Sequence, residues 1–445
     1  MRKSNIPVRT FVLALLFGFV ARPDENWPQW RGPNFTGHVE ASGLPVAWSE
    51  SENIVWKVEL PSWSGSTPII WGDNIFVTSP SKGEKGGHGS TADRPSVGKQ
   101  ILLLCVDKKT GALRWERGLD VGNEKINKQN DSSPSPVTDG HHVWALTGTG
   151  TLAAFTVDGA PLWRRNLQEM YGAFGLQFGY GSSPLLYDGM IIVQTLHGFF
   201  TDDPSYVVAF DGITGEVRWH VERPTDAPLE SPDAYSTPLP VTHDGQTVIV
   251  VSSGDYVTGH DPATGEEVWR AGGLNPEKSE RNRIIASSVA CCGMVFSPSR
   301  QKPLLALLAG GSGDVTAGRL VWKWEERYGT DVPTPACDGA YLYMVDDRGM
   351  ATCLEPATGK ALWGPERTAR GVVSASPLVA DGKVYITNED AVTTVLAAGP
   401  EYKKLATNTL DKVYTLSSIA VSGDRLYLRT ATHLYCIGEQ DKQDK

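Results

Sequence analysis

The chain has few of the residues that mark the common hydrolases and metalloproteins. Its nine His show no metal-ligand spacing, and it lacks a Gly-x-Ser-x-Gly segment, the nucleophile elbow of many hydrolases. Its six Cys are scattered over 445 residues and are not expected to form a disulfide framework. These shortages argue against a hydrolase, a histidine metal site and a small disulfide-stapled domain.

Basic residues are also in short supply. The chain has 41 Lys and Arg against 51 Asp and Glu, a formal net charge of −10. A surface with this balance repels a phosphate backbone. We therefore expect no nucleic-acid partner.

Long hydrophobic runs are missing except at the N-terminus. There, Arg2, Lys3 and Arg9 precede the apolar run FVLALLFGFVA. The run is too short to span a membrane comfortably and is typical of a secretory signal peptide over residues 1–21; a buried strand is the alternative. No Cys precedes Cys105, which excludes a lipid on a mature N-terminal Cys. We expect a periplasmic or secreted monomer without a transmembrane segment after signal removal.

Glycine and tryptophan, in contrast, are plentiful and recur in a fixed pattern. In VAFDGITGEVRW an acidic residue is followed by Gly four positions later and by Trp eight positions later. The pattern predicts a hairpin: the carboxylate accepts a backbone hydrogen bond, Gly takes a positive φ, and Trp packs between repeats rather than on a ligand. A shortened relative ends at Trp163, and the full copies are Asp107, Gly111 and Trp115; Asp211, Gly215 and Trp219; Asp261, Gly265 and Trp269; Asp314, Gly318 and Trp322; and Glu355, Gly359 and Trp363.

A second pattern alternates with the first. Ser/Thr-Pro, or a small-residue equivalent, precedes a short apolar run and a Gly/Asp turn at eight places, marked by Pro68, Pro136, Pro184, Pro238, Val289, Pro335, Pro377 and Ile419. Each unit thus reads as four short strands, A to D, with the Trp on strand D. Four strands in a repeat of this length predict an all-β fold, an eight-bladed β-propeller.

The two ends of the repeat array complement each other. The last unit supplies only strands A to C, whereas NIVWKVEL, Asn53 to Leu60, has the strand D pattern with Trp56 and lies before the first unit. We predict that this N-terminal strand completes the last blade and closes the ring; an open solenoid would leave the match unexplained. The expected domains are a signal peptide (1–21), an N-terminal extension (22–51), the propeller (52–440) and a charged tail (441–445).

The D-x-x-T-G-x-x-x-W repeats resemble those of the pyrroloquinoline quinone (PQQ) repeat propellers over about residues 52 to 440. The opening NWPQWRGPNFTG, Asn26 to Gly37, is similar to the start of many secreted planctomycete PQQ-repeat proteins. The family includes quinoprotein alcohol dehydrogenases and the non-enzymatic propeller of the outer-membrane assembly machine. The resemblance therefore implies the fold, while catalysis and pure binding both stay open.

An enzyme of this family would use PQQ and calcium. Quinoprotein dehydrogenases often carry a vicinal disulfide beside the cofactor, and Cys291-Cys292 are adjacent, but they occupy a strand A turn on the opposite face. Asp331 is a possible base by location, although no calcium-ligand set aligns with it. We expect no catalytic residue, metal or cofactor, with a PQQ/calcium-dependent alcohol or sugar dehydrogenase as the alternative. Burial as small apolar groups is expected at the other Cys, namely Cys105, Cys337, Cys353 and Cys436.

Long loops are concentrated in the first half of the ring. The D-to-A and B-to-C connections share one face, and those of the early blades are long and rich in aromatic residues with Arg. This composition favours a binding surface for a protein or polymer in the cell envelope, and the alternative is that the aromatic residues only pin the loops. We expect Ser79 to Gln100 to form a mobile flap. The predicted partner-binding residues are Trp63, Tyr171, Phe174, Phe178, Tyr180, Phe199, Phe200, Tyr235, Arg281 and Arg283.

Overall fold

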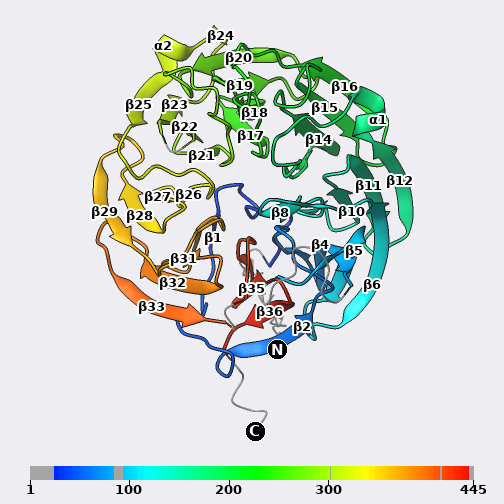
Figure 1. Ribbon diagram of the computed structural model, residues 1–445. Coiled ribbons are helices and arrows are strands. Elements are labelled where there is room, and N and C mark those ends of the chain that lie inside the picture. Colours follow the sequence, from blue (N-terminus) through cyan, green and yellow to red (C-terminus); the bar gives the residue numbers. More distant parts are fainter. Residues whose placement is uncertain (1–24, 85–93, 301, 411–412, 440–445) are drawn as a thin grey trace, which may run out of the picture.

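The computed structural model describes residues 25–84, 94–300, 302–410 and 413–439 and consists mainly of eight blades arranged around a common axis (Figure 1). Each blade has four antiparallel strands, and two of the blades gain a short parallel fifth strand; the arrangement confirms the predicted eight-bladed propeller. Strand A lies nearest the axis and strand D forms the outer rim (Figure 1). The predicted signal peptide and the charged tail lie outside the described residues.

The blades follow the chain in order. Blade 1 has β3 (Ile69–Trp71), β4 (Asn74–Lys82), β5 (Val97–Asp107) and β6 (Leu113–Val121); blade 2 has β9 (Val137–Thr138), β10 (His142–Leu146), β11 (Thr151–Thr156) and β12 (Pro161–Asn166); blade 3 has β13 (Leu185–Tyr187), β14 (Met190–Thr195), β15 (Tyr206–Asp211) and β16 (Val217–Glu222); blade 4 has β17 (Leu239–His243), β18 (Gln246–Ser253), β19 (Tyr256–His260) and β20 (Glu267–Gly272).

The second half of the ring repeats the arrangement. Blade 5 has β21 (Val289–Cys291), β22 (Met294–Pro298), β23 (Leu304–Leu308) and β25 (Leu320–Trp324); blade 6 has β26 (Ala336–Cys337), β27 (Leu342–Val345), β28 (Met350–Leu354) and β29 (Ala361–Arg367); blade 7 has β30 (Leu378–Ala380), β31 (Lys383–Thr387), β32 (Val392–Ala397) and β33 (Lys404–Thr409); blade 8 has β34 (Ala420–Ser422), β35 (Arg425–Arg429), β36 (His433–Ile437) and β2 (Ile54–Glu59).

Blade 8 closes the ring as predicted, because β2 pairs with β36. A buried side chain adds a second link at the same junction, the seam between blades 8 and 1. Arg429 on β35 donates to the carbonyl oxygens of Thr78 and Ser62, at 2.9 Å for Ser62, and to Ser79 Oγ at 3.2 Å, all in or beside blade 1. The seam is thus held by a strand and by a fully buried cation whose charge is met by backbone carbonyls.

The Trp repeat joins six of the eight blades to the next one. The Asp261 carboxylate accepts from the backbone N–H groups of Ala263 and Thr264, and Gly265 takes a φ of +78° beneath the Trp219 ring of the preceding blade. Six repeat indoles donate Nε1–H to a backbone carbonyl of the following blade: Trp56, Trp115, Trp163, Trp219, Trp322 and Trp363. The prediction that these Trp residues are packing wedges is confirmed.

Blade 5 departs from the pattern, so the predicted turn at Asp314 and Gly318 is wrong. Asp314 belongs to β24 (Gly313–Asp314), which pairs in parallel with β20 of blade 4, and Gly318 lies in the helix α2 (Thr316–Arg319). The buried Trp269 indole of blade 4 therefore finds no turn carbonyl, and its Nε1 has no hydrogen-bond partner. An insertion that keeps the spacing of Asp, Gly and Trp conceals this change in the sequence.

The Ser/Thr-Pro repeat forms a closed belt of hydrogen bonds around the axis. In every blade the backbone N–H of the Ser or Thr before strand A donates to the hydroxyl of its counterpart in the next blade, at 2.8 to 3.3 Å. The eight members are Thr67, Ser135, Ser183, Thr237, Ser287, Thr334, Ser376 and Ser418. Small hydroxyl side chains satisfy the backbone where the strands crowd together at the centre.

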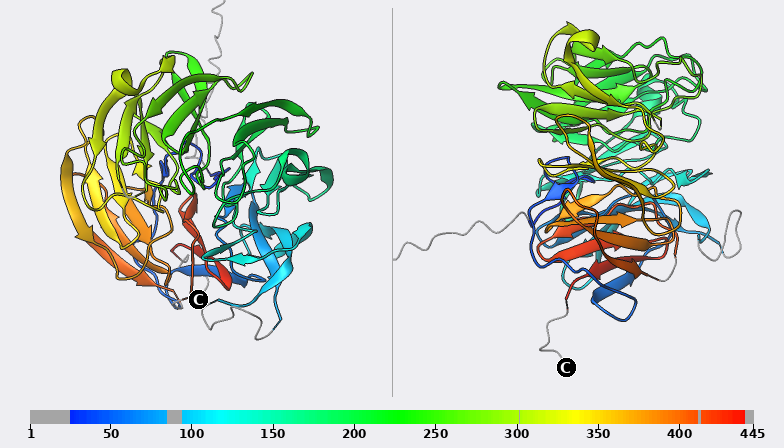
Figure 2. Two further views of the ribbon diagram at one scale, coloured as in Figure 1. Left: turned by 45° about the horizontal axis from the view of Figure 1, so that its top comes forward. Right: turned by 90° about the vertical axis from the view of Figure 1, so that its left-hand side faces the viewer.

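The N-terminal extension crosses the axis on the face of the A-to-B turns (Figures 1 and 2). Trp27 bridges to Ile70 of blade 1, and β1 (His38–Val39) pairs in parallel with β30 of blade 7. Between them, buried Arg31 donates to the carbonyl oxygens of Pro335 and Pro377 in blades 6 and 7. The extension therefore covers one end of the central channel.

The cysteines differ from the sequence prediction at one place. Cys105, Cys353 and Cys436 are buried free thiols, as predicted. Cys337 is buried as predicted but forms a disulfide with Cys291 across blades 5 and 6, so Cys291 and Cys292 do not form a vicinal disulfide. The sequence separates the two Cys by 46 residues, and the stacking of strand A in neighbouring blades brings them together.

The two ends of the predicted flap are paired strands. Strand β4 extends to Lys82 and strand β5 begins at Val97, so both ends of the segment from Ser79 to Gln100 belong to one antiparallel hairpin. Residues 85–93 lie outside the described residues. Among the described residues, no helix is long and apolar enough to cross a membrane.

Candidate functional site

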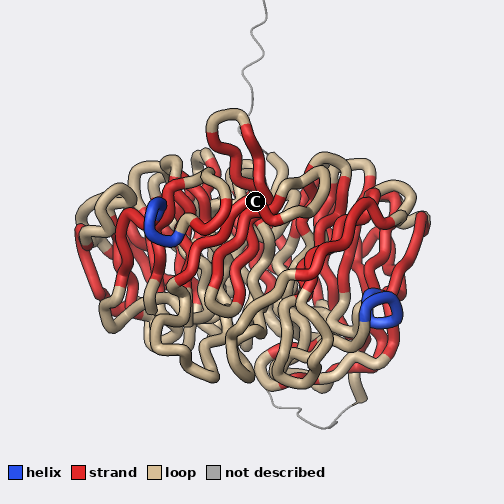
Figure 3. Tube along the Cα trace, turned by 90° about the horizontal axis from the view of Figure 1, so that it is seen from above, coloured by secondary structure: helices blue, strands red, loops and turns tan. Residues whose placement is uncertain are grey.

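The long loops gather on the face of the D-to-A and B-to-C connections (Figure 3). The link after blade 1 contains a small hairpin of β7 (Lys125–Ile126) and β8 (Gln129–Asn130). It reaches across the channel mouth, where Lys128 Nζ lies 2.8 Å from the Glu389 carboxylate of blade 7 and Tyr414 Oη donates to the Lys128 carbonyl at 3.2 Å. The mouth is therefore partly bridged and narrowed.

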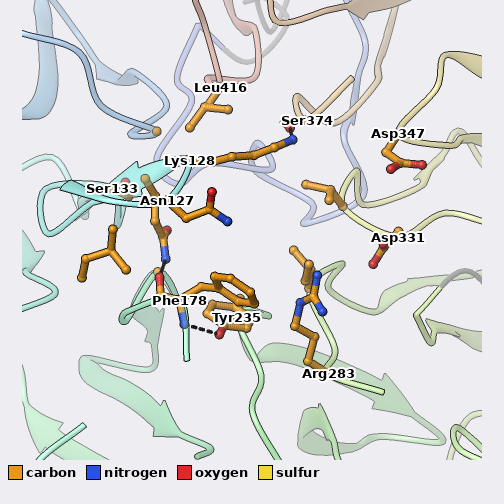
Figure 4. A pocket seen from close by; sticks show the side chains of 16 residues that line it. Asn127, Lys128, Ser133, Phe178, Tyr235, Arg283, Asp331, Asp347, Ser374 and Leu416 are labelled. Carbon is orange, nitrogen blue, oxygen red and sulfur yellow. Dashed lines mark hydrogen bonds between the residues drawn. The ribbon is translucent and has the colours of Figure 1, made fainter. Parts of the chain in front are cut away.

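A cavity of about 350 Å³ lies beside this hairpin at the mouth of the channel (Figure 4). Phe178 and Tyr235 line one side and Asp331 and Asp347 the opposite side (Figure 4). Arg283 lies between them. The remaining lining residues include Gly65, Ile126, Asn127, Lys128, Gln129, Ser133, Gly181, Ile285, Val332, Ser374 and Leu416.

Phe178 is held in place by hydrogen bonds to its backbone. Its N–H donates to Tyr235 Oη at 3.0 Å, and its carbonyl accepts from Gln129 Nε2 at 2.5 Å. The preceding N–H, of Gln177, donates to the Asp233 carboxylate at 2.8 Å. The two rings, whose centroids are 6.5 Å apart, thus form a positioned apolar wall rather than a loose loop tip.

Asp331 brings a buried carboxylate to the other wall. Only 6% of the residue is exposed, and its Oδ1 has no hydrogen-bond partner. Burial raises the pKa of this carboxyl above its usual range, while the nearby cations Arg283 and Arg300 oppose the rise. An unsatisfied carboxylate oxygen in a cavity wall is suited to receive a cation or a hydrogen-bond donor.

The basic side chains of the cavity are already paired. Arg283 donates to the Glu230 carboxylate at 2.9 Å, and its guanidinium lies 4.9 Å from the centre of the Phe178 ring. Lys128 contacts Glu389 and, at 3.4 Å, Ser374 Oγ. Both cations are thus engaged by carboxylates, although Arg283 Nε, like Asp331 Oδ1, has no hydrogen-bond partner.

Four of the predicted partner-binding residues make packing contacts within the fold. Trp63 is 2% exposed and meets Tyr414 edge to face. Tyr180 is also 2% exposed and donates to the Gln194 carbonyl at 2.7 Å, with Phe174 stacked on its ring. Tyr171, in the helix α1 (Leu167–Tyr171), stacks on His220 at 4.3 Å. These contacts are those expected from the alternative prediction, that aromatic residues pin the loops, and partner binding at these residues stays a prediction.

Three others lie away from the cavity lining. Phe200 is 68% exposed and contacts Phe199 edge to face, on the loop between β14 and β15. Arg281 is exposed near Arg300, which donates to its carbonyl at 2.7 Å. The backbone of exposed Leu229, which was not predicted, lies beside Gly198 in the loop between β14 and β15. Phe199, Phe200 and Leu229, three apolar residues of neighbouring loops, are called the apolar rim.

Sequence reasoning also missed the polar part of the cavity. Asn127, Lys128 and Gln129 belong to a link that was recognised as long, but their polar side chains carried no motif. Asp347 and Ser374 lie in the short links of blades 6 and 7, which looked minimal. Only the closed ring brings them opposite the long loops.

PQQ with calcium requires free cations for the quinone carboxylates and several oxygen ligands that converge on the metal. The cavity cations are engaged by carboxylates, as described above. Among the described residues, the sole group of three His, Cys, Asp or Glu side chains with converging donor atoms is Cys291, Cys292 and Cys337, on the opposite face. The lining therefore does not fit PQQ with calcium.

Solved structures resemble this chain in fold. BamB from Moraxella catarrhalis aligns with a TM-score of 0.60 at 15% identity, covering 88% of this chain and 98% of its own. The quinohemoprotein alcohol dehydrogenase from Comamonas testosteroni gives 0.66 at 12% identity, covering 95% and 82%. A europium-containing methanol dehydrogenase gives 0.67 at 11% identity, covering 92% and 98%. At these identities the likeness concerns the fold alone.

A family match is more specific. No curated protein sequence matches the chain significantly. The family profile described as outer membrane protein assembly factor BamB, of the PQQ-repeat type, matches residues 98–296 and 312–433, more than half of the chain. The interruption, residues 297–311, falls in blade 5 and covers the end of β22 and all of β23. The chain is therefore a member of the PQQ-repeat β-propeller family to which this BamB profile belongs.

Proposed function

We propose that the protein is an exported, non-catalytic scaffold that binds a protein or polymer partner at the cavity on its elaborated face. The observation that carries the proposal is the combination of a positioned aromatic wall, Phe178 and Tyr235, with the unsatisfied carboxylate of Asp331 opposite. A cavity of this size holds a side chain or a short extended segment rather than a domain.

The lining indicates the chemistry of the partner. Aromatic rings bury apolar groups, and a desolvated carboxylate without a partner gains most from a cation. A segment that presents a Lys or Arg beside an apolar residue would satisfy both walls at once. A protein partner therefore suits the cavity better than a neutral polymer.

The N-terminal extension, which covers one end of the channel, determines the side from which a partner can approach the cavity. The A-to-B face is covered by the N-terminal extension, with Trp30 in the channel lining below the cavity. A partner would enter from the opposite face, across the rim of Phe199, Phe200 and Leu229. The BamB description of the family supports a protein partner in the cell envelope, and a periplasmic or secreted location is part of the proposal.

The test compares point variants in the capture of envelope proteins. Purified parent, Phe178→Ala and Asp331→Asn would be immobilised, and bound proteins identified after crosslinking. The matched control is Ile213→Ala, which removes an exposed apolar side chain from the Asp211 to Gly215 turn, away from the cavity lining. We expect a roughly tenfold loss of the same partner in both cavity variants, while the control binds like the parent. Equal capture by all four proteins would place the site elsewhere.

The alternative is a PQQ/calcium-dependent alcohol or sugar dehydrogenase. Its test is titration of the purified protein with PQQ and calcium, followed by cofactor absorbance and dye reduction with alcohols and sugars. We expect neither stoichiometric quinone binding nor turnover. Turnover that Asp331→Asn abolishes would replace the scaffold proposal with the enzyme.

A further inference from the structure

Three sulfur atoms converge on the face opposite the cavity. Cys291 ends β21 and Cys337 ends β26, and their disulfide joins blades 5 and 6 with Cα atoms 6.5 Å apart. Cys292 keeps a free thiol, which donates to the Gly339 carbonyl at 3.0 Å. The three sulfur atoms all lie within 4.8 Å of one another. Two neighbouring A-to-B turns thus assemble a cluster made of sulfur alone.

The turn itself does not call for a cysteine at position 292. Cys292 has a φ of +56°, a conformation that costs a non-glycine residue energy unless its side chain suits the turn. The matching position is Asp in three other blades, Asp188, Asp244 and Asp381, with φ values of 47°, 48° and 52°. Asp is a favoured residue for such turns. Sulfur at this site is therefore better explained by its chemistry than by the backbone.

The cluster is also accessible, unlike the other thiols. Cys292 is exposed and Cys291 half-buried, whereas the free thiols of Cys105, Cys353 and Cys436 are buried. Asp338 follows Cys337 directly, and its carboxylate accepts from the N–H groups of Ala340 and Tyr341, which holds a negative charge nearby. Negative charge and open access both favour a cation at the sulfur atoms.

We propose that Cys291, Cys292 and Cys337 form a redox-gated site for one soft, thiophilic metal ion, with copper(I) as its simplest occupant. A dithiol reductant supplies two electrons and two protons, opens the disulfide to two thiols and becomes a disulfide itself. The metal then displaces the three thiol protons. In the oxidised protein only the Cys292 thiol can bind the ion, so the site is closed.

The geometry and the donor type agree with this assignment. Metal–thiolate bonds of about 2.3 Å place three sulfur ligands roughly 4 Å apart, and the three sulfur atoms here lie within 4.8 Å of one another. Soft sulfur donors select copper(I) and related ions over calcium or magnesium, which require oxygen. No His, Asp or Glu belongs to the converging group among the described residues, so a hard cation has no ligand there.

The experiment uses the full chain and copper(I) as the probe. Protein reduced with a phosphine and desalted without oxygen would be titrated against a chromophoric copper(I) chelator, with the ultraviolet thiolate-to-copper band as a second readout. We expect one tightly held ion per reduced chain and at least a tenfold weaker affinity in Cys292→Asp. This variant restores the residue of the other turns, so it should fold. Cys353→Ala, which removes a buried thiol elsewhere in blade 6, is the control and should bind like the parent.

Two results would overturn the site. One is equal copper retention by the reduced parent and Cys292→Asp, or by the oxidised and reduced parent. The other is failure of the reductant to expose three alkylatable thiols in the folded protein, as counted by mass spectrometry. Neither result depends on the proposed partner cavity, which lies on the other face.

Discussion

Thr67 accepts a hydrogen bond from the backbone N–H of Ser418 at 3.2 Å, across 351 positions of sequence. The contact closes the hydroxyl belt at the seam where the first and last blades meet. Along the rest of the belt, the same bond joins consecutive blades. Closure of the propeller thus uses three devices at different radii: the belt at the axis, Arg429 between the blades and β2 at the rim.

Removal of one belt hydroxyl should weaken the seam. Thr67→Val keeps the volume but leaves the buried N–H of Ser418 without an acceptor, which costs about 1–3 kcal/mol in the free energy of unfolding. Thr67→Ser keeps the oxygen and should cost less. Denaturant unfolding followed by tryptophan fluorescence measures both. Equal losses would mean that the hydroxyl contributes nothing beyond its packing.

The glycines beneath the Trp rings should tolerate no side chain. Gly265 and Gly245 have almost the same φ, +78° and +77°, but a Cβ on Gly265 would overlap Trp219, whereas nothing lies within 4 Å of one on Gly245. Gly245→Ala should cost about 1–2 kcal/mol for the backbone conformation alone. Gly265→Ala should cost clearly more in the same unfolding experiment. A similar cost for both would show that the Trp219 ring moves aside freely.

The indole N–H groups allow a similar comparison. Trp219 donates to the Pro262 carbonyl at 2.9 Å, while the Nε1 of Trp269 has no partner. Substitution by Phe should therefore cost about 1 kcal/mol more at Trp219 than at Trp269. Substitution by Ala at either position should cost about 3–5 kcal/mol, because both rings are buried. A larger loss for Trp269→Phe would point to a hydrogen bond that the described contacts lack.

The fold was predictable because its signals are local and repeated. Asp, Gly and Trp mark each hairpin, and β2 carries the strand D pattern that the last blade lacks. At Asp314 and Gly318 the same spacing was misleading, since β24 and α2 preserve the count of residues while changing the turn. The spacing of a repeat locates each unit in the sequence, but it does not reveal a segment whose structure changes while the spacing stays the same.

The candidate site was less predictable because it is built across the ring. Phe178, Tyr235, Arg283 and Asp331 were recognised from loop composition or position and do line one cavity. Burial separates them from Trp63 and Tyr180, which look the same in sequence but face the interior. The disulfide between Cys291 and Cys337 likewise depends on the stacking of neighbouring blades.

The loop that carries Phe178 should respond to pH through Asp233. This buried carboxylate accepts from the N–H groups of Gln177 and, at 3.2 Å, Phe199, and so ties two loops of the elaborated face together. Burial raises the pKa of Asp233 to about 6, with nearby Glu230 adding to the rise and the backbone N–H groups opposing it. The folded chain consequently holds a proton that the unfolded chain, with a pKa of about 4, has already released.

The direction in which stability changes with pH follows from this difference in bound protons. Between pH 4 and pH 6 the folded state binds more protons than the unfolded state, so the contribution of Asp233 to stability falls as the pH rises and is constant above the folded pKa. Asp233→Asn removes the titration. We expect the difference in unfolding free energy between parent and variant to shift against the parent from pH 4 to 6 and to be level above pH 7. If the unfolding free energies of parent and variant ran parallel over the whole pH range, Asp233 would titrate with an ordinary pKa. Its carboxylate would then be better hydrated than its burial indicates.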